Sequence, residues 1–475
     1  MTKVRFPPSP TGPMHIGTAR TLLVNFLFAK GKNGKIVMRS EDTDRERSTP
    51  EFEKEILAGI EWLGLSFDEG PFKQSERDAI YQQYFEKLKE TKAIYPCFCS
   101  SEELEAERAM QKEKKLPPKY SGKCRNLSSE EIAKFESEGR KAVWRFRVPE
   151  KEIAFEDLVR GKISERGENI ADFVIRKSDG QFLYHFTVCV DDAEMEITHV
   201  IRGEDHISNT SKHILLFEAL GVEIPQFAHL PLLLNKDRSK MSKRDEGGKP
   251  ATIQRLKEDG YLPEAVVNFL ALLGWNPGQG SEKEFFSVEE LIKEFDFKHV
   301  AKAGAIFDLE RLNFFNAHYL RKLSPSELAE KIKPFLSFEI DDEEVLEKAV
   351  KLASERMRFF GEANEFLHYF FGELTYEVTL FENPKMKVDL EKARNSLEAA
   401  LPILEKIENW KEEEIQKQLF AIIEKLAMKN GEMLWPLRVA LTGEKFSPGV
   451  WEMCGVLGKE KSLERIRKAL DKLKN

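Results

Sequence analysis

The first 90 residues alternate between short apolar segments and longer stretches with a helical period. Lys3–Phe6 and Lys35–Arg39 have the mixture of apolar and basic residues that a short buried strand can carry. Two stretches place apolar residues three or four positions apart: Leu22, Leu23, Phe26 and Leu27, then Phe52, Ile56, Ile60 and Leu63. This spacing predicts two helices, the first beginning near Ile16 and the second ending at Gly64. The βαβ order predicts a parallel sheet that binds ligands at the carboxyl ends of its strands.

The pattern changes between residues 91 and 185. Glu102–Lys115 is rich in Glu and Lys and predicts a helix. Ala142–Val148 and Phe182–Val188 are rich in aromatic and β-branched residues, which predicts strands. Asp179–Gly180 predicts a hairpin turn before the second of them. We therefore expect an inserted α/β unit here.

Beyond this insertion, the chain first returns to the α/β pattern and then becomes helical. Strand and helix patterns alternate again between His199 and Leu234, but strand signals nearly vanish after residue 320. One helix there is marked by Ile415, Leu419, Ile422, Ile423 and Leu426. Asn430–Gly431 is a signal for its end. Residues 321–475 are predicted to be all-helical.

Composition limits the class of protein. A chain of 475 residues is expected to form two to four domains, and 41% hydrophobic with 33% charged residues fits a soluble globular protein. No run of eighteen apolar residues and no signal-peptide pattern occurs, so we expect a cytoplasmic protein without a membrane partner. Five cysteines in such a chain argue against a disulfide framework. The net charge of −8 neither supports nor excludes a nucleic-acid partner.

The first stretch with candidate chemistry is Phe6–Thr18, a Pro- and Gly-rich turn between a predicted strand and a predicted helix. Such a turn presents free backbone N–H groups to an anion. Gly12 and Gly17 permit close approach of a ligand, and His15 at the start of the helix can reach a phosphate. The alternative is a proline-rich connection whose histidine faces solvent.

The second stretch, Lys240–Arg244, crowds cations into a loop of small residues after an apolar run. A solvated basic turn is the alternative interpretation of any such pentapeptide taken alone. Its position 225 residues after His15, in this order, is much harder to obtain by chance.

Together, the two stretches resemble the HIGH and KMSKS signatures of class I aminoacyl-tRNA synthetases. Pro8–Gly12, Ser40–Asp44 and Val200–Asp205 resemble bacterial glutamyl-tRNA synthetases in particular. The resemblance runs nearly the full length and is densest before residue 320. It implies an α/β fold: a Rossmann-like parallel sheet with an inserted α/β acceptor-binding domain, followed by an all-α anticodon-binding region. The implied limits are 1–90 and 186–320 for the catalytic halves, the latter with the stem-contact region, 91–185 for the insertion, and 321–475 for the helical region.

The implied activity is glutamate–tRNA ligation through a glutamyl-adenylate. A carboxylate attacking the α-phosphorus of ATP needs no general base, only positioning and cationic stabilisation. His15 and the first-turn N–H groups would hold the α-phosphate side, while Lys240 and Lys243 would clamp the β- and γ-phosphates, with Gly17 completing the catalytic set. Mg²⁺ would accompany ATP as a phosphate ligand. The ATP-binding residues implied are Pro13, His15, Gly17, Thr18, Asp205, Lys240, Met241, Ser242, Lys243 and Arg244.

The resemblance also implies a glutamate pocket. A dicarboxylic ligand with one ammonium group calls for at least two cations and an anion. Arg5 and Arg202 match the cations, Glu41 would bind the α-ammonium group, and Tyr184 would close the pocket. The full implied set is Arg5, Pro7, Ser9, Glu41, Tyr184 and Arg202. Val188 stands where some relatives carry Asn, so the polar contact at that position is in doubt.

Three cysteines form the one metal-like constellation in the sequence. Cys97, Cys99 and Cys124 offer three thiolates, while a closed zinc site needs four donors. No histidine lies between residues 16 and 184, so a nearby histidine cannot supply the fourth. Tyr120 fits an arrangement seen in some relatives. The alternatives are a structural Zn²⁺ that braces the insertion, or three small buried hydrophobes.

The resemblance leaves the tRNA partner open: tRNA-Glu, tRNA-Gln or both. It implies a monomer whose helical region reads the anticodon. Three alternative functions share parts of this pattern: a sister enzyme that glutamylates a modified base and lacks an anticodon domain, a glutaminyl-tRNA synthetase with a β-barrel anticodon region, and a non-catalytic binding paralogue. The long helical region predicted after residue 320 disfavours the first two alternatives. The intact motif residues disfavour the third.

Overall fold

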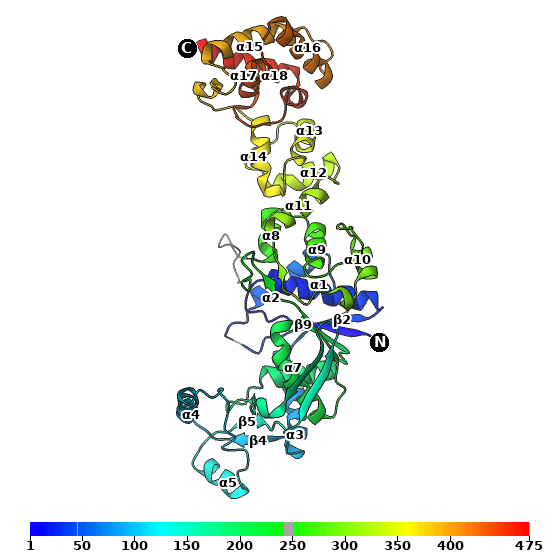
Figure 1. The fold of residues 1–475 in the computed structure, drawn as a ribbon, viewed down its shortest axis with the longest axis vertical. Coiled ribbons are helices and arrows are strands. Elements are labelled where there is room, and N and C mark those ends of the chain that lie inside the picture. The colour runs from blue at the N-terminus through cyan, green and yellow to red at the C-terminus, as the bar shows by residue number, and fades with distance from the viewer. Residues whose placement is uncertain (45, 242–250, 279, 475) are drawn as a thin grey trace. The chain divides into compact units, whose positions relative to one another are not determined.

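The computed structural model describes residues 1–44, 46–241, 251–278 and 280–474. The chain divides into two compact units (Figure 1). The α/β unit comprises Met1–Leu256 and Val266–Leu309, and the helical unit comprises Lys257–Ala265 and Glu310–Asn475. In the described ranges three helices cross the division: α8 (Ile253–Asp259), α9 (Pro263–Ala271) and, by its first residue, α11 (Leu309–Leu320).

The α/β unit begins with the predicted parallel sheet. Its strands are β1 (Lys3–Phe6), β2 (Lys35–Ser40) and β3 (Glu69–Lys73), in the order β1-β2-β3. The connecting helices are α1 (Ile16–Gly31), α2 (Pro50–Trp62) and α3 (Asp78–Glu90). Helix α2 starts where Thr49 accepts a hydrogen bond from the Phe52 backbone N–H, with Pro50 at the first helical position. The predicted βαβ start of the chain is confirmed.

A second sheet has the order β7-β6-β10-β9. Its strands are β6 (Glu152–Asp157), β7 (Gly161–Arg166), β9 (His199–Gly203) and β10 (Gln226–Leu230), and α7 (Ile207–Leu220) connects the last two. Strand β10 is parallel to both β9 and β6. The Thr198 N–H donates to the Lys3 carbonyl at 2.9 Å, which places β9 beside β1. The sheet takes strands from both sides of residue 185, and the predicted domain limits remain predictions.

The smaller elements of the α/β unit include an antiparallel sheet in the order β4-β5-β8. Its strands are β4 (Ile94–Cys97), β5 (Val143–Phe146) and β8 (Val174–Arg176). Helices α4 (Ser101–Glu113) and α5 (Ser129–Ser137) each start at a capping box, in which a serine and a glutamate satisfy each other's backbone N–H. The remaining elements are α10 (Val288–Glu294), β11 (Leu233–Leu234) and β12 (Ala305–Ile306).

The strand predicted at Phe182–Val188 is wrong. Phe182 makes a single bridge to Arg176 after the predicted turn, and helix α6 then runs over Tyr184–Glu194. Its residues from Phe186 to Asp192 are all buried, so no exposed polar face shows a helical period. Packing on all sides therefore overrode the strand preference of these aromatic and β-branched residues.

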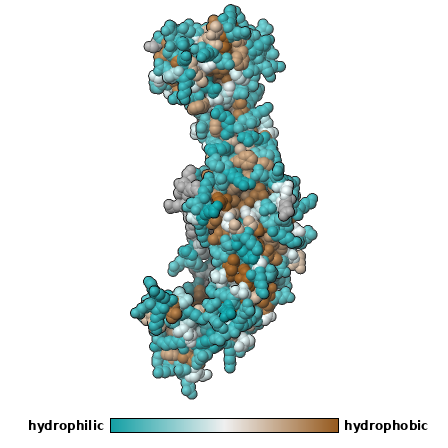
Figure 2. Space-filling model, viewed as in Figure 1, coloured by the Kyte–Doolittle hydropathy of each residue, from teal (hydrophilic) through white to brown (hydrophobic). Residues whose placement is uncertain are grey.

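The helical unit confirms the predicted all-α region. Its helices are α11 (Leu309–Leu320), α12 (Pro325–Ile332), α13 (Glu343–Ser354), α14 (Ala363–Leu367), α15 (Leu390–Glu405), α16 (Glu412–Lys425), α17 (Asn430–Thr442) and α18 (Val450–Lys474). Their apolar residues share one core, and the face seen in Figure 2 is predominantly hydrophilic. The helix end predicted at Asn430–Gly431 is wrong: these residues begin α17, and Ala427, with φ of 52°, turns the chain after α16.

None of the helices in the described ranges combines the length and apolar character required to cross a bilayer.

Candidate active site

A cavity of about 580 Å³ lies where β1, β2 and β9 end and α1 begins. Every ATP- or glutamate-binding residue predicted within the described ranges lines it: Arg5, Pro7, Ser9, Pro13, His15, Gly17, Thr18, Glu41, Tyr184, Arg202, Asp205, Lys240 and Met241. The other three predicted residues, Ser242, Lys243 and Arg244, lie outside the described residues. The structure thus brings together residues from across 240 positions of sequence.

His15 is the N-cap of α1. Its Nδ1 accepts a hydrogen bond from the Gly17 backbone N–H at 3.1 Å. A neutral imidazole that accepts at Nδ1 carries its proton on Nε2, the atom from which it can donate. A Cβ at Gly17 would lie 3.4 Å from the His15 Nδ1, so glycine keeps this turn uncrowded. The helix start combines backbone N–H groups, a positive dipole end and an imidazole donor, all suited to a phosphate.

Lys240 and Met241 line the same cavity as His15. On one side the Met241 N–H donates to the Leu233 carbonyl at 2.9 Å. On the other side, Ile16 N–H donates to Ala251 O at 3.1 Å and Ile253 N–H donates to Met14 O at 3.0 Å. Met241 is therefore bonded beside β11, and Ala251 and Ile253 are bonded to the residues on either side of His15. His15 and Lys240 therefore line one cavity, and Lys243 lies outside the described residues.

The side of the cavity lined by Lys240 and Asp205 is exposed to solvent. The Lys240 Nζ lies 3.6 Å from Asp205 Oδ2, with 62% and 46% of these side chains exposed. A pair this exposed contributes little to stability and can separate readily. Lys240 is therefore able to exchange Asp205 for a more highly charged ligand.

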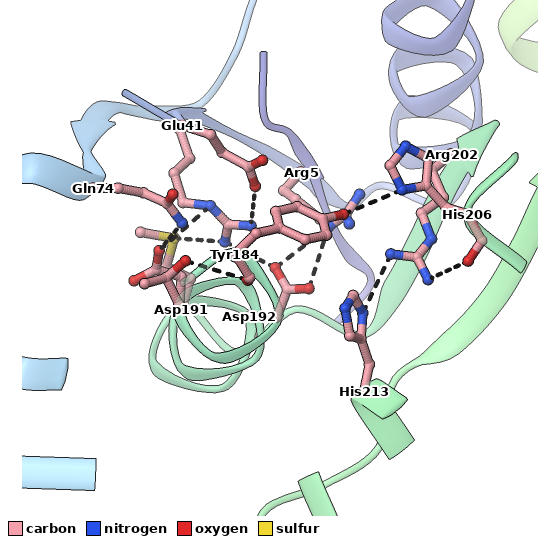
Figure 3. Close-up of polar contacts among 12 residues, drawn as sticks. Arg5, Glu41, Gln74, Tyr184, Asp191, Asp192, Arg202, His206 and His213 are labelled. Atoms are coloured by element: carbon pink, nitrogen blue, oxygen red, sulfur yellow. Dashed lines mark hydrogen bonds and ion pairs between the residues drawn. The ribbon is translucent and has the colours of Figure 1, made fainter. Parts of the chain in front are cut away.

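The opposite side of the cavity holds buried charges (Figure 3). Arg5, Glu41 and Arg202 are only 2%, 8% and 6% exposed. Tyr184, at the start of α6, places its hydroxyl 3.3 Å from His206 Nδ1. Burial raises the pKa of Tyr184 to about 12, so its hydroxyl keeps its proton near neutral pH.

Sequence reasoning missed a buried ionic network beneath Arg5 and Glu41. Arg39 is fully buried and its Nη1 donates to Asp192 Oδ1 at 2.8 Å, while its Nη2 lies 3.3 Å from Glu41 Oε1. Asp192 also accepts from the Arg5 Nε at 3.3 Å. Asp191 lies 3.7 Å from the Arg39 Nε and accepts from Gln74, Arg77 and Tyr81. Arg39 therefore fixes Glu41, and Asp192 fixes Arg5. The contact between Arg39 and Asp192 links the two pairs.

These charges compensate one another. Burial raises the pKa of Glu41, and the guanidinium groups of Arg39 and Arg5 oppose that shift. Burial alone would lower the pKa of Arg39, but Asp192, Asp191 and Glu41 together hold it above its ordinary value. A signal was present in the sequence: Asp191–Asp192 follows the apolar run Phe186–Val190, and buried charges need partners.

Arg202 has different surroundings, which sequence reasoning also missed. Its Nε donates to His229 Nε2 at 3.2 Å, and its Nη1 lies 3.3 Å from His213 Nδ1. Its Nη2 donates to the Thr210 hydroxyl at 2.7 Å and to the His206 carbonyl at 3.2 Å. In the described part of the chain, all its hydrogen-bond partners are thus uncharged groups or imidazoles.

Comparison with known proteins decides the family. Residues 1–314 match the family model "tRNA synthetases class I (E and Q), catalytic domain", and residues 327–470 match "Anticodon binding domain". The glutamate–tRNA ligase of Carboxydothermus hydrogenoformans is 44% identical over 98% of this chain and 99% of its own. That of Aquifex aeolicus is 45% identical over 99% of each. The chain belongs to the bacterial glutamate–tRNA ligases.

A solved structure of a glutamate–tRNA ligase supports the same fold over the full chain. The enzyme from Elizabethkingia meningosepticum, in complex with its amino acid, superposes with a TM-score of 0.88 at 34% identity, covering 99% of both chains. The resemblance inferred from the sequence is therefore confirmed, as is the predicted fold class. The match to an anticodon-binding model also excludes the sister-enzyme interpretation, in which that domain is lacking.

The cysteines also come together in this member of the ligase family. The Sγ atoms of Cys97, Cys99 and Cys124 all lie within 4.8 Å of one another. The Tyr120 hydroxyl is 3.3 Å from Cys97 Sγ and 3.7 Å from Cys99 Sγ, and it accepts from the Cys124 N–H. Three sulfur atoms and one oxygen at such separations match the donor number and spacing of a tetrahedral zinc site.

Proposed function

We propose that this cavity catalyses both steps of glutamate–tRNA ligation: formation of glutamyl-adenylate from glutamate and ATP, then transfer of the glutamyl group to the 2′-hydroxyl of the terminal adenosine of tRNA. The observation that carries the proposal is the junction of two sites in one cavity. A helix start and a lysine suited to phosphates face a pocket of buried arginines suited to an acidic amino acid.

In the first step, an α-carboxylate oxygen of glutamate attacks the α-phosphorus of ATP and pyrophosphate leaves. The nucleophile is already an anion, so the protein supplies position and charge rather than a base. His15 Nε2 and the α1 N–H groups hold the α-phosphate, with Pro13, Gly17 and Thr18 shaping the turn. Lys240 and Lys243 draw charge off the leaving phosphates, and Met241, Ser242 and Arg244 complete that loop. Mg²⁺, bound through the ATP phosphates, supplies further charge neutralisation.

Asp205 has the position for the ribose side of the nucleotide. It lies in a turn of 3₁₀ helix that follows β9, and it pairs with Lys240. A carboxylate there can accept hydrogen bonds from ribose hydroxyls, while Lys240 moves to the phosphates.

In the amino-acid pocket, Arg202 and Arg5 bind the carboxylates of glutamate, and Glu41 binds its α-ammonium group. Pro7 and Ser9 provide the adjoining wall and polar contacts, and the Tyr184 hydroxyl closes the pocket. The charges of these groups match those of the ligand, with two cations for two carboxylates and an anion for the ammonium. Val188 is 1% exposed and does not line the cavity, so it offers no polar contact in place of the Asn of some relatives.

The partners follow from this chemistry: L-glutamate, ATP and tRNA, with the helical unit reading the anticodon through its unstacked bases. The tRNA substrate is tRNA-Glu, tRNA-Gln or both. Because tRNA charging uses the ATP and tRNA of the cytoplasm, we expect the protein there, acting as a monomer.

We also propose that Cys97, Cys99, Cys124 and Tyr120 hold a structural Zn²⁺. Three thiolates and a phenolate would leave the metal site with net negative charge. The Arg145 guanidinium, 3.9 Å from the centre of the Tyr120 ring, offsets part of that charge. The metal would brace β4 and the following segment and take no part in the reaction.

Glutamate-dependent exchange between ATP and labelled pyrophosphate tests the first step. We expect exchange that requires tRNA, and charging of at least one of purified tRNA-Glu and tRNA-Gln. Absence of exchange with either tRNA would favour a non-catalytic binding protein. Parallel charging assays with the two tRNAs resolve which of them is the substrate.

A further inference from the structure

The two arginines that face the amino-acid pocket differ in the charge around them. Arg5 forms an ion pair with Asp192, at 3.3 Å. Arg202 forms no such ion pair in the described residues: its four hydrogen-bonding partners are His229, His213, Thr210 and a backbone carbonyl, and the charge of Asp192 acts on it only without a hydrogen bond. Both side chains are almost completely buried. The difference raises the question of how a buried cation is kept without a carboxylate beside it.

Hydrogen-bond chemistry fixes the protonation of the two histidines. A guanidinium group has only donors, so the imidazole atom facing it must be an acceptor. His229 Nδ1 lies 2.6 Å from Asp157 Oδ2 and donates to it, which leaves Nε2 as the acceptor for Arg202. His213 accepts from Arg202 at Nδ1, so its proton is on Nε2, 3.1 Å from His185 Nδ1. Both rings are therefore neutral, and each has its tautomer fixed by a partner on its far side.

The surroundings support this assignment. His213 is 2% exposed and His229 is fully buried. Burial, followed by the charge of Arg202, lowers the pKa of His213 well below its ordinary value. Burial also lowers the pKa of His229, although Asp157 opposes the shift. Neutral imidazoles satisfy the directional needs of the guanidinium and remove none of its charge.

We propose that His213 and His229 are specificity-determining positioning residues, which orient the Arg202 guanidinium while leaving its positive charge uncompensated for the acidic side chain of the substrate. This inference rests on the proposed function. An anionic side chain restores charge balance on binding. A carboxamide of the same shape, as in glutamine, leaves a buried cation without an anion. The pocket therefore favours glutamate through the electrostatic state of Arg202 as well as its hydrogen bonds.

The sharpest test changes charge without changing shape. His213→Asp and His213→Asn both place an oxygen near the position of Nδ1, but only Asp neutralises Arg202. We expect His213→Asp to lower the ratio of kcat/KM for glutamate to that for glutamine by about 30-fold relative to His213→Asn, mainly through KM for glutamate. His213→Asn is expected to be slower than wild type but to keep its preference. KM for ATP should differ little between the two variants.

A second pair repeats the comparison on another side of the guanidinium. Thr210 is fully buried and its hydroxyl accepts from Arg202 Nη2, so Thr210→Asp and Thr210→Asn form an independent matched set. Thermal unfolding adds a readout that does not involve activity. If Arg202 is uncompensated, each Asp variant gains an ion partner and melts no lower than its Asn counterpart.

Several outcomes would overturn the inference. Equal glutamate-to-glutamine ratios in the Asp and Asn variants would assign the histidines a purely structural role. Asp variants that unfold while the Asn variants fold would show that Arg202 is already compensated. Failure of the proposed function is separate, because wild-type protein would then show no glutamate-dependent exchange with any tRNA.

Discussion

The two sides of the cavity hold their charges in opposite ways. On the amino-acid side, Arg5, Glu41 and Arg202 are each less than one-tenth exposed. Arg5 and Arg202 each make two or more hydrogen bonds to buried groups, and Glu41 pairs with the buried Arg39. On the nucleotide side, the Lys240 and Asp205 side chains are about half exposed and pair at 3.6 Å. The buried side is thus held in place by its own contacts, whereas the exposed Lys240–Asp205 pair can separate readily.

This difference between the two sides suggests separate roles: the amino-acid side is expected to control selectivity, and the nucleotide side is expected to control rate. Buried groups have already lost their hydration and side-chain freedom during folding, so a matching ligand recovers strong interactions at little further cost. Under the proposed function, the exposed Lys240 side chain can follow charge as it moves onto pyrophosphate and then release it. Substitutions on the amino-acid side should therefore change KM for glutamate or the stability of the fold. Substitutions on the nucleotide side should change kcat.

The largest expected effect tests how the amino-acid side is held. Arg39→Met removes the common partner of Asp191, Asp192 and Glu41 and leaves buried carboxylates without that cation. Breaking such a network costs about 3–5 kcal/mol. Urea unfolding followed by circular dichroism should show this loss in the α/β unit. A variant as stable as wild type would mean that Arg39 does not support the pocket.

Arg202→Met separates binding from folding and is the matched control for Arg39→Met. Because no carboxylate in the described residues pairs with Arg202, its removal leaves no unpaired anion. We expect stability to fall by about 1–2 kcal/mol, the cost of unsatisfied imidazole acceptors. We expect kcat/KM for glutamate to fall roughly 150-fold, which corresponds to a loss of about 3 kcal/mol of transition-state stabilisation. The comparison fails if Arg202→Met destabilises the fold as much as Arg39→Met.

His15→Asn tests the role proposed for the nucleotide side of the cavity. Asn is a good N-cap and can accept from the Gly17 N–H as Nδ1 does, but it lacks the donor at the position of Nε2. Loss of one donor to developing phosphate charge is expected to slow exchange about 100-fold, with KM for glutamate little changed. Melting temperature should stay within a few degrees of wild type, which distinguishes a lost donor from a lost cap. Exchange at the wild-type rate would remove His15 from the chemistry.

The sequence predicted the residues that line the cavity better than the buried residues that hold them in place. Many of the lining residues belong to local sequence motifs, such as the strand, proline-rich turn and helix start around His15. Such motifs predict the local backbone geometry directly. Supporting contacts such as Arg39 to Asp192 join residues 153 positions apart, and neither residue lies in a recognisable motif. The histidines around Arg202 come from α7 and β10, and only the folded chain shows that they face one guanidinium.

The two secondary-structure errors have related causes. Phe182–Val188 has the composition of a strand, but α6 is buried continuously from Phe186 to Asp192, which removes the polar face that identifies a helix. Asn430–Gly431 is a frequent helix end, yet here Ala427 adopts the left-handed conformation and the pair starts the next helix. Local preference decided neither case, because packing and the positions of neighbouring turns determined both.

The smallest effect on chemistry is expected at the cysteine cluster, which lines neither side of the cavity. If Zn²⁺ is bound, purified protein carries about one zinc ion per chain, and Cys99→Ser loses it. The rate of glutamate-dependent exchange should then change less than about threefold, while susceptibility to proteolysis around β4 rises. Cys454→Ala, in the core of the helical unit, is the control and should leave zinc content unchanged. Protein purified without chelators that contains no zinc and cannot take it up would show that the three thiols are merely packed small side chains. In that case Cys99→Ser would cost little stability, because a half-buried thiol replaced by a hydroxyl of similar size loses only modest packing.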